Sequence, residues 1–520
     1  MRPCRALAVM LLAGTACLNA ERYVLESVAY DGDGKTQERF LSGALAIQAG
    51  AGFDSEEAYE RYRAGIERKL RNERIFAFSE ITEERTAQED GTIAVSWTIR
   101  TVDSENLLVA PYPKYDSNSG LTFKIKLKDN NFLGRMSPLS LDLAFGTEKD
   151  EDEDIDETYR FFGISLDYNF PFMLGAVNAR WLNNYAMQYT WGERGMEYGL
   201  STGLKLSLPY KRLSFDLTLL QSLTRDHEYE EFGDTLFATE HALFEVPITL
   251  ARTRTFGDIV YAPYSSATYN WDKDGISAEN EDLRGPYFEA GHGIRLGAVN
   301  WNGNFREGFS ISVKNLIGYN QETHDWIPGI QAELKAHAHW WRFNPSARAY
   351  AAGYHNGTEK IGHNLRGIKD IQKFAPAYSA KVGRKKALDV QAACILNCDL
   401  TVKVMETDWY GLGQALFRTE EPPAIFSLLR HCDFELHVSP FLDAALTTNK
   451  ATGSSFDWRD GFYSGGLEVI VYPSHWRSIQ IRASAGLDIG RQFLSNSLNM
   501  DWRKDNVSKK EIYVGFGLFY

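Results

Sequence analysis

The sequence predicts a transmembrane antiparallel β-barrel, of about 16 strands with 18 as the alternative, preceded by one small α+β domain. Three observations lead to this fold class. The first twenty residues have the composition of an export signal, no later stretch reaches the roughly 18–20 apolar residues of a membrane helix, and apolar and polar residues alternate from Leu107 onward. A membrane barrel escapes detection by hydropathy because only every second residue of a strand faces lipid.

Residues 1–20 are interpreted as a signal peptide. Arg2 and Arg5 give a positive start, residues 6–13 form an unbroken apolar run, and small residues follow. Cleavage after Ala20 or Ala16 fits this pattern. Lipid attachment at Cys17 is the alternative, and it is less favoured because Gly14 stands where a larger aliphatic residue is usual.

Composition narrows the classes of function. The formal net charge is −13, which argues against nucleic acid as a partner because a phosphate backbone is bound by clustered positive charge. After cleavage at Ala20 only Cys394, Cys398 and Cys432 remain, too few and too scattered for a disulfide scaffold or a zinc site. We interpret them as small apolar fillers.

Residues 21–104 predict a domain with the order β-α-α-β-β. A break at residues 50–55, which contains Gly50 and Gly52, separates two helices, and Ser55 or Asp54 caps the second one. That helix has one apolar face, because its large apolar residues recur at steps of three and four. The other elements are predicted at residues 23–30, 36–47, 78–84 and 92–102.

Residues 105–520 predict the barrel. Residues 121–128 illustrate the period of two, with Leu, Phe, Ile and Leu alternating with Thr and three Lys. The stretch 259–356 resists a clean strand count. Short connections alternate with long polar ones, so we expect the short turns on the periplasmic side, the long loops outside, and an even number of strands. The short connections are 131–137, 171–175, 211–212 and 255–258, and the long ones are 148–158, 188–196, 227–236 and 273–285.

The last residues predict the closing strand. One face carries Ile512, Val514, Phe516, Leu518 and Tyr520. Tyr513, Gly515, Leu518 and Tyr520 resemble the C-terminal signal of outer-membrane barrels, with its polar-x-Gly-x-x-apolar-x-aromatic spacing. Gly515 and Gly517 make this strand thin and weakly packed, which favours a seam that can open against the first strand at 107–115.

The N-terminal domain resembles a POTRA domain, a periplasmic module of the BamA-type outer-membrane assembly and transport superfamily. The resemblance rests on the element order, on Gly52-Phe53-Asp54 before the second helix and on Phe78-Ser79-Glu80-Ile81 after it. It departs from the pattern before the second strand, where Ile75 and Phe76 occupy the region of a usual glycine. A generic small α+β domain is the alternative. A POTRA domain implies an exposed strand edge that can add an incoming chain.

The barrel resembles the same superfamily in an ordered set of motifs. Residues 128–135 resemble its Asp-Asn-x-Leu-Gly turn, residues 396–400 its Asn-x-Glu strand with Asp399 in place of Glu, and residues 439–444 its Phe-x-Asp-Ala strand. Leu365-Arg366-Gly367 resembles its Val-Arg-Gly-Phe/Tyr loop, with Ile368 in place of the aromatic residue.

The resemblance implies that Arg366 folds into the barrel lumen and pairs with acids on the following strands. Parity agrees, because the apolar neighbours of Asp399 and Asp443 face outward and both carboxylates therefore face inward. A second copy of the tripeptide, Leu283-Arg284-Gly285, precedes Pro286 and has too many strands after it. We expect that copy to be an ordinary outer loop.

The resemblance implies a protein of the bacterial outer membrane, with the POTRA domain in the periplasm, that assists insertion or assembly of outer-membrane proteins or translocates polypeptides. Its expected partners are unfolded outer-membrane or secreted polypeptides, outer-membrane lipid, and periplasmic lipoproteins or chaperones. A passive pore or surface antigen, and an exported soluble β protein, are the alternatives. No arrangement of nucleophile and base is evident, so we expect no enzyme and no cofactor. His337 and His339 lack a third ligand at suitable spacing, so we expect lumen or girdle residues and no metal site.

Overall fold

A computed structural model describes residues 22–116, 120–149, 158–175, 177–192, 195–225, 236–253, 257–271, 285–357, 359–368, 389–449, 452–503 and 509–520. The signal peptide predicted at residues 1–20 lies outside these ranges, and so do Leu283 and Arg284 of the second tripeptide copy. Within the described ranges, no helix has both the length and the apolar character needed to cross a membrane.

The N-terminal domain is a four-stranded sheet with two helices on one face. Its elements are β1 (Arg22–Asp33), α1 (Glu38–Leu45), β2 (Gly52–Phe53), α2 (Glu56–Asn72), β3 (Phe76–Ala87) and β4 (Thr92–Asp103), and the sheet order is β2-β1-β4-β3. The hydroxyl of Ser55 accepts the N–H of Ala58 at 3.2 Å and so caps α2. Tyr59, Ile66 and Leu70 of α2 pack on Trp97 and Ile99 of the sheet in one buried core.

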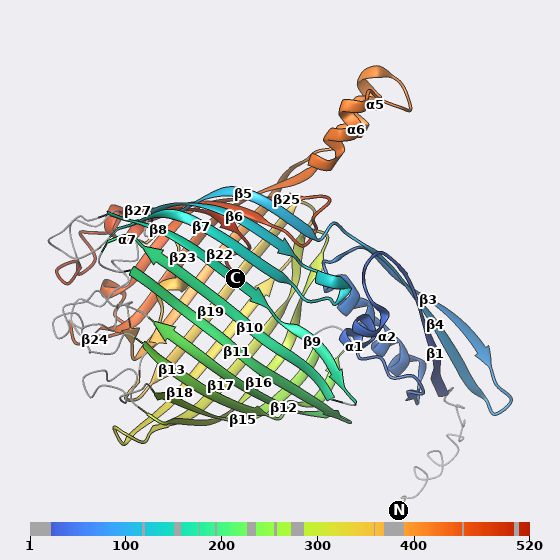
Figure 1. Ribbon diagram of the computed structural model, residues 1–520, viewed down its shortest axis with the longest axis horizontal. Coiled ribbons are helices and arrows are strands. Elements are labelled where there is room, and N and C mark those ends of the chain that lie inside the picture. Colours follow the sequence, from blue (N-terminus) through green and yellow to red (C-terminus); the bar gives the residue numbers. More distant parts are fainter. Residues whose placement is uncertain are drawn as a thin grey trace, which may run out of the picture.

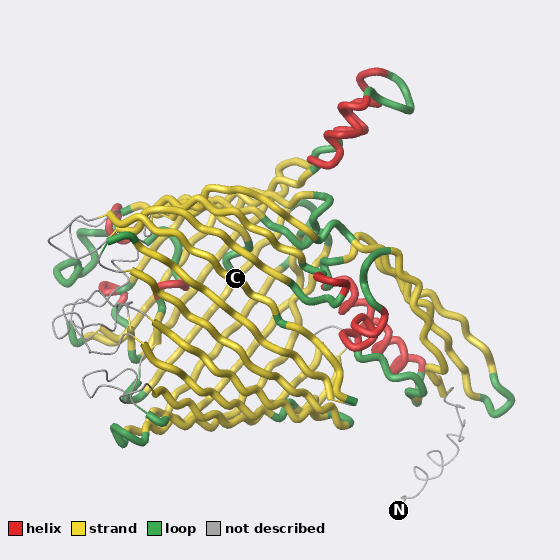
Figure 2. Tube along the Cα trace, viewed as in Figure 1, coloured by secondary structure: helices red, strands yellow, loops and turns green. Residues whose placement is uncertain are grey.

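The rest of the chain forms a closed antiparallel barrel, as predicted (Figures 1 and 2). Its strands are β5 (Leu107–Asp116), β6 (Gly120–Asp129), β7 (Leu139–Lys149), β8 (Thr158–Tyr168), β9 (Phe170–Leu174), β10 (Val177–Thr190), β11 (Gly195–Tyr210), β12 (Leu213–Arg225), β13 (Leu236–Glu245), β14 (Ile248–Thr253), β15 (Gly257–Trp271), β16 (Tyr287–Asn302), β17 (Phe305–Asn320), β18 (Asp325–His337), β19 (Phe343–Tyr354), β22 (Ala392–Glu406), β23 (Phe434–Asn449), β24 (Ser454–Ser455), β25 (Phe462–Pro473), β26 (Ile481–Asp488) and β27 (Lys510–Phe516).

The barrel has more membrane-crossing strands than the preferred prediction of 16. Of the 21 strands placed in the ring, β9 continues β8, β14 continues β13, and the two-residue β24 pairs only with the end of β23. The remaining 18 crossings match the alternative count and are even in number. The preferred count was too low because outward-facing polar residues such as His292 and Asn315 interrupt the apolar alternation of β16 and β17, while backbone pairing continues regardless of side chain.

The barrel has two distinct ends (Figure 1). We call the end that carries the N-terminal domain the domain end. The strand β5 begins there, β27 runs toward it, and most connections at that end are short turns. One departs from the expected alternation of loop lengths: residues 407–433 join β22 to β23 through the helices α5 (Trp409–Phe417) and α6 (Ala424–Leu429) and the 3₁₀ turn η4 (Arg430–Cys432).

Several contacts fasten the N-terminal domain to the barrel mouth, among them one at the turn after β6 and one at Arg74. One contact is made by the turn after β6, which contains η1 (Phe132–Gly134). The backbone N–H of Gln37 donates to the carbonyl of Gly134 in this turn at 2.8 Å. The two backbones meet so closely that a side chain at Gly134, whose φ is +68°, would overlap the carbonyl of Lys35. The predicted Asp-Asn-x-Leu-Gly turn is therefore a docking turn for this domain.

Arg74 makes the second contact and bridges separate parts of the mouth. Its guanidinium donates to the carbonyl of Gly303 at 3.0 Å, to Asn304 Oδ1 at 2.7 Å and to the carbonyl of Arg477, and it lies 4.1 Å from the ring of Trp301. Gly303 and Asn304 form the β16–β17 turn, whereas Arg477 belongs to the β25–β26 turn. Burial lowers the pKa of Arg74 to about 10.

Candidate functional site in the lumen

A loop from the far end of the barrel folds into the lumen. It follows β20 (Glu359–Lys360) and a 3₁₀ turn η3 (Gly362–Asn364), and β20 pairs with β21 (Asp389–Val390). Its apolar residues Ile361, Leu365 and Ile368 are buried in one cluster with Ile395 of β22 and Phe462 of β25. Ile368, which replaces the aromatic residue of the resembled motif, is fully buried there, so an aliphatic side chain fills the position.

Arg366 reaches the carboxylates of three neighbouring strands. Its Nη2 and Nε donate to Oδ1 and Oδ2 of Asp443 at 2.7 and 3.0 Å, and its Nη1 donates to Asp399 Oδ1 at 2.7 Å. Nη1 also lies 3.3 Å from Glu468 Oε1. The structure thus brings together the three residues selected from the sequence, Arg366, Asp399 and Asp443, with Arg366 only 5% exposed.

Glu468 and Arg482 are parts of this network that the sequence reasoning missed. Glu468 on β25 accepts a hydrogen bond from Nη1 of Arg482 on β26 at 3.1 Å, so one carboxylate is shared by two arginines. Its neighbour Leu467 is exposed on the outer face. The alternation of faces along β25 therefore places Glu468 in the lumen, as it places Asp399 and Asp443 on their own strands.

Aromatic rings enclose the guanidinium. Its carbon lies 4.0 Å from the ring centre of Phe441 and 4.4 Å from that of Phe519. The edge of the planar guanidinium donates hydrogen bonds to carboxylates, and its faces stack on aromatic rings. Arg366 is therefore held in one orientation.

Gly367 ties the loop to the last strand. Its backbone N–H donates to Oε2 of Glu511 on β27 at 2.6 Å. Its φ is +73°, and a Cβ there would lie 2.9 Å from the backbone nitrogen of Leu487 on β26. Only glycine meets both the left-handed torsion and the close approach. The loop thereby touches every strand from β22 to β27 apart from the short β24.

The chain end departs from the prediction. The closing strand stops at Phe516, and Gly517, with φ +88°, turns the chain inward. Tyr520 then lies in the lumen, where its hydroxyl donates to Asp399 Oδ2 and its carbonyl accepts Nη1 of Arg306. The prediction that Leu518 and Tyr520 continue the face of Ile512 was therefore wrong, because polar partners in the lumen satisfy the tail there. Tyr513 and Gly515 do belong to the strand, with the Tyr513 ring beside Gly515.

Few paired positions join the described residues of the first and last strands. Within the described ranges, which omit residues 117–119, β27 pairs with β5 at Tyr513↔Asp116 and Val514↔Tyr115, whereas β26 and β27 share seven paired positions. Tyr112 and Phe516 add one edge-to-face ring contact at 4.7 Å. Among the described residues, fewer backbone pairings join β27 to β5 than join β26 to β27.

The two histidines have ordinary partners. His337 is buried in the lumen and shares a hydrogen bond of 2.7 Å with the hydroxyl of Ser346, while His339 stacks on Phe305 at 4.5 Å. Within the described ranges, no group of three or more His, Cys, Asp or Glu is arranged to hold a metal ion.

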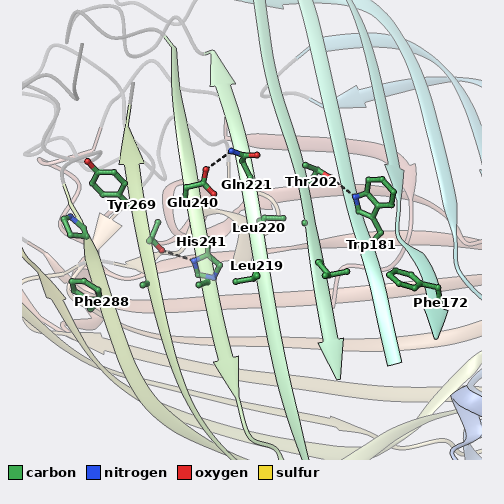
Figure 3. Close-up of a pocket in the computed structure, with 16 residues that line it drawn as sticks. Phe172, Trp181, Thr202, Leu219, Leu220, Gln221, Glu240, His241, Tyr269 and Phe288 are labelled. Atoms are coloured by element: carbon green, nitrogen blue, oxygen red, sulfur yellow. Dashed lines mark hydrogen bonds between the residues drawn. The ribbon is translucent and has the colours of Figure 1, made fainter. Parts of the chain in front are cut away.

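A groove of about 800 Å³ lies elsewhere, on the outer face of the wall from β10 to β16 (Figure 3). Trp181 donates to Thr202 at 2.9 Å and Gln221 donates to Glu240 at 2.7 Å along it. These residues belong to strands that do not contact Arg366, so the groove is separate from the lumen site.

The closed ring, its apolar outer face and the inward-folded arginine loop define a β-barrel membrane protein with an ordered lumen loop. Among solved structures, the chain is similar to CdiB from Acinetobacter baumannii, with a TM-score of 0.47, 11% identity, and coverage of 95% of this chain and 73% of that one. It is similar to BamA from Haemophilus ducreyi lacking POTRA domains 1-3 (TM-score 0.40, 13% identity, 95% and 84% covered). CdiB from Escherichia coli gives a TM-score of 0.40, 9% identity, and 97% and 92% coverage. No protein-family model and no curated protein matches the chain.

Proposed function

We propose that this chain is an outer-membrane barrel that inserts other polypeptides into the membrane or translocates them, with residues 1–20 as its signal peptide, residues 21–104 as a periplasmic POTRA domain and residues 105–520 as the barrel. The observation that carries the proposal is the seam between β5 and β27, where the described residues share two paired positions in a ring whose other junctions are extensively paired. A junction with two paired positions is the part of the wall that opens with the least loss of hydrogen bonds.

The client enters this scheme through the N-terminal domain. Within the described ranges, β3 pairs on one side only, with β4, so its other edge is open over twelve residues. An extended polypeptide can add to such an edge as a further strand. The partners are therefore unfolded outer-membrane or secreted polypeptides, membrane lipid, and periplasmic lipoproteins or chaperones that deliver the client.

The lumen loop has a stabilising part in this scheme. Arg366 and Gly367 connect β22, β23, β25 and β27 through side-chain contacts, so the strands on one side of the seam move as a unit. Opening then occurs between β27 and β5 and leaves the rest of the wall intact. Catalytic chemistry has no part in the proposal.

A seam-locking experiment tests the proposal. The pair Y513C and D116C, in a background without Cys394, Cys398 and Cys432, places two thiols at paired positions across the seam. In liposomes the reduced protein should accelerate folding of an unfolded barrel client, and oxidation should abolish the acceleration. A control pair at the paired positions Ala290 and Ile317 of β16 and β17 should leave the rate unchanged.

Two results would contradict the proposal. The first is a reduced protein that neither accelerates client folding nor releases a secreted client. The second is an activity that the oxidised seam leaves intact. A large, stable conductance without client activity would instead support a passive pore.

A further inference from the structure

The α5–α6 hairpin is a projection from the barrel wall at the domain end. It continues the direction of β22 and β23 and extends sideways past the wall, away from the N-terminal domain (Figure 1). Asp408 Oδ1 accepts the N–H of Gly411 at 2.8 Å, and Asp433 Oδ1 accepts the N–H of Trp409 at 3.0 Å. These bonds cap α5 and join the two ends of the hairpin, and the Thr407 N–H donates to the carbonyl of Phe434 on β23 at 3.0 Å.

The hairpin exposes most of its large apolar side chains. Gly413 packs against Phe426, which holds the two helices together, but few apolar residues point into that contact. The exposed ones are Leu412 (45%), Leu416 (63%), Phe417 (56%), Ile425 (54%) and Leu428 (65%). Five large apolar side chains exposed on two short, paired helices form an apolar surface that water solvates poorly.

Charge is absent from both helices. Residues 409–417 and 424–429 contain no Asp, Glu, Lys or Arg, and the charged residues lie at the ends of the hairpin. Arg418, Glu420 and Glu421 are in the connection between the helices, and Asp408, Arg430 and Asp433 are at the base. The exposed face of a helix in water usually carries charged residues, and these two helices have none.

The neighbouring turn has the same character. Trp340 and Trp341, between β18 and β19, are 74% and 70% exposed. The backbone N–H of Lys403 on β22 donates to the carbonyl of their neighbour Arg342 at 2.9 Å. This turn therefore lies beside the part of β22 that leads into the hairpin. Tryptophan concentrates at the boundary between lipid tails and headgroups, because its ring is apolar and its N–H is polar.

We propose that the α5–α6 hairpin and the Trp340-Trp341 turn form a monotopic anchor that inserts into the periplasmic leaflet of the membrane around the barrel. The molecules that cover the apolar side chains of the hairpin are phospholipids. The hairpin follows directly on β22, whose outward residues Leu396, Leu400 and Val404 are exposed, and it extends sideways past the wall, over the surrounding bilayer and not beneath the barrel mouth. The inference rests on the membrane position of the barrel and adds a second attachment to it.

Depth measurements on the full chain test the anchor. Single cysteines replace Leu416, Ile330 and Asp90 in the cysteine-free background, and each carries an environment-sensitive fluorophore in phosphatidylcholine vesicles. Ile330 is 54% exposed on the outer face of β18 and reports the lipid band, whereas Asp90 lies in the exposed β3–β4 turn and reports water. The label at 416 should be quenched by nitroxide-labelled lipid like that at 330, and should be several-fold less accessible to aqueous iodide than that at 90.

Four outcomes are informative. Iodide access at 416 equal to that at 90, with 330 quenched by lipid, overturns the anchor and leaves the membrane barrel standing. Protection at 416 that disappears on tenfold dilution of protein into lipid assigns the surface to a second copy and also overturns it. A label at 330 that lipid does not quench overturns both the anchor and the proposed function. Loss of lipid quenching at 416 on adding Leu428→Glu, with 330 unchanged, supports the anchor.

Discussion

Asp443 holds both the side chain and the backbone of Arg366. Its Oδ2 accepts the Arg366 backbone N–H at 2.9 Å and Nε at 3.0 Å, while Oδ1 accepts Nη2 at 2.7 Å. The Asp443 side chain is fully buried. One carboxylate on β23 therefore sets both the position of the lumen loop and the orientation of its guanidinium. Asp399 and Glu468 contact the remaining guanidinium nitrogen, Nη1.

Replacement of Arg366 should destabilise the barrel strongly. Arg366→Ala leaves the carboxylates of Asp399 and Asp443 buried without their cation, which costs about 3–5 kcal/mol. Arg366→Lys keeps the charge but loses the two parallel hydrogen bonds to Asp443, so an intermediate loss is expected. Urea unfolding of the full chain in detergent measures both. The control Arg295→Ala removes an exposed ion pair of 3.9 Å to Glu245 and should cost under about 1 kcal/mol. Equal losses for Arg366→Ala and the control would contradict the assignment.

Gly367→Ala should displace the lumen loop. The substitution adds left-handed strain of about 1–2 kcal/mol and a Cβ that lies 2.9 Å from the Leu487 nitrogen. Gly453→Ala is a matched control, because Gly453 has φ +69° but nothing within 4 Å of an added Cβ. We expect the unfolding free energy to fall clearly more for Gly367→Ala than for Gly453→Ala. If the two substitutions are equivalent, the close contact with β26 contributes nothing.

Tyr520→Phe should loosen the tail from the lumen. The change keeps the ring but removes the hydroxyl that donates to Asp399, and a hydrogen bond to a charged group contributes about 1.5–3 kcal/mol. The measurement is the thermal unfolding midpoint of the full chain, compared with that of Tyr269→Phe, whose ring is 48% exposed on the outer face. A midpoint that falls only for Tyr520→Phe is expected, and no difference would place the tail outside the lumen.

The N-terminal domain should lose stability in acid through Glu83. Burial alone would raise the pKa of Glu83, but the hydrogen bonds from Tyr59 and Arg85, with Arg63 at 3.3 Å, bring it below the ordinary value of 4.5. A carboxyl with a depressed pKa stabilises the folded state above its unfolded pKa, and this contribution is lost as the pH falls through the folded pKa.

Glu83→Gln should therefore cost about 1–2 kcal/mol at neutral pH and progressively less below about pH 4. Hydrogen exchange of β3 and β4 in the full chain, with variant and wild type compared at each pH, measures the difference. Asp31→Asn is the control, because Asp31 is largely exposed and lies 3.8 Å from Arg100. A difference that grows in acid would reverse the expected sign.

The sequence by itself determined which residues face the lumen. Alternation along a strand is a local property of the backbone, so the outward position of Leu400 and Leu442 was sufficient to place Asp399 and Asp443 inside. The capped helix of the N-terminal domain and the even number of strands follow from similarly local signals. The resemblance to a known family supplied the choice of Arg366, which parity alone does not select.

The tertiary structure decided which lumen residues meet. Glu468, Arg482 and Glu511 join the Arg366 network because the order of strands in the closed ring brings them to one side, and no local pattern encodes that closure. The inward turn at Gly517 depends on partners for Tyr520 that are distant in sequence, Arg306 and Asp399. The alternation of side chains along a strand decides which face of the wall each residue occupies. Which lumen residues contact each other depends on the order of strands in the closed barrel, which hydrogen bonds between distant parts of the chain establish.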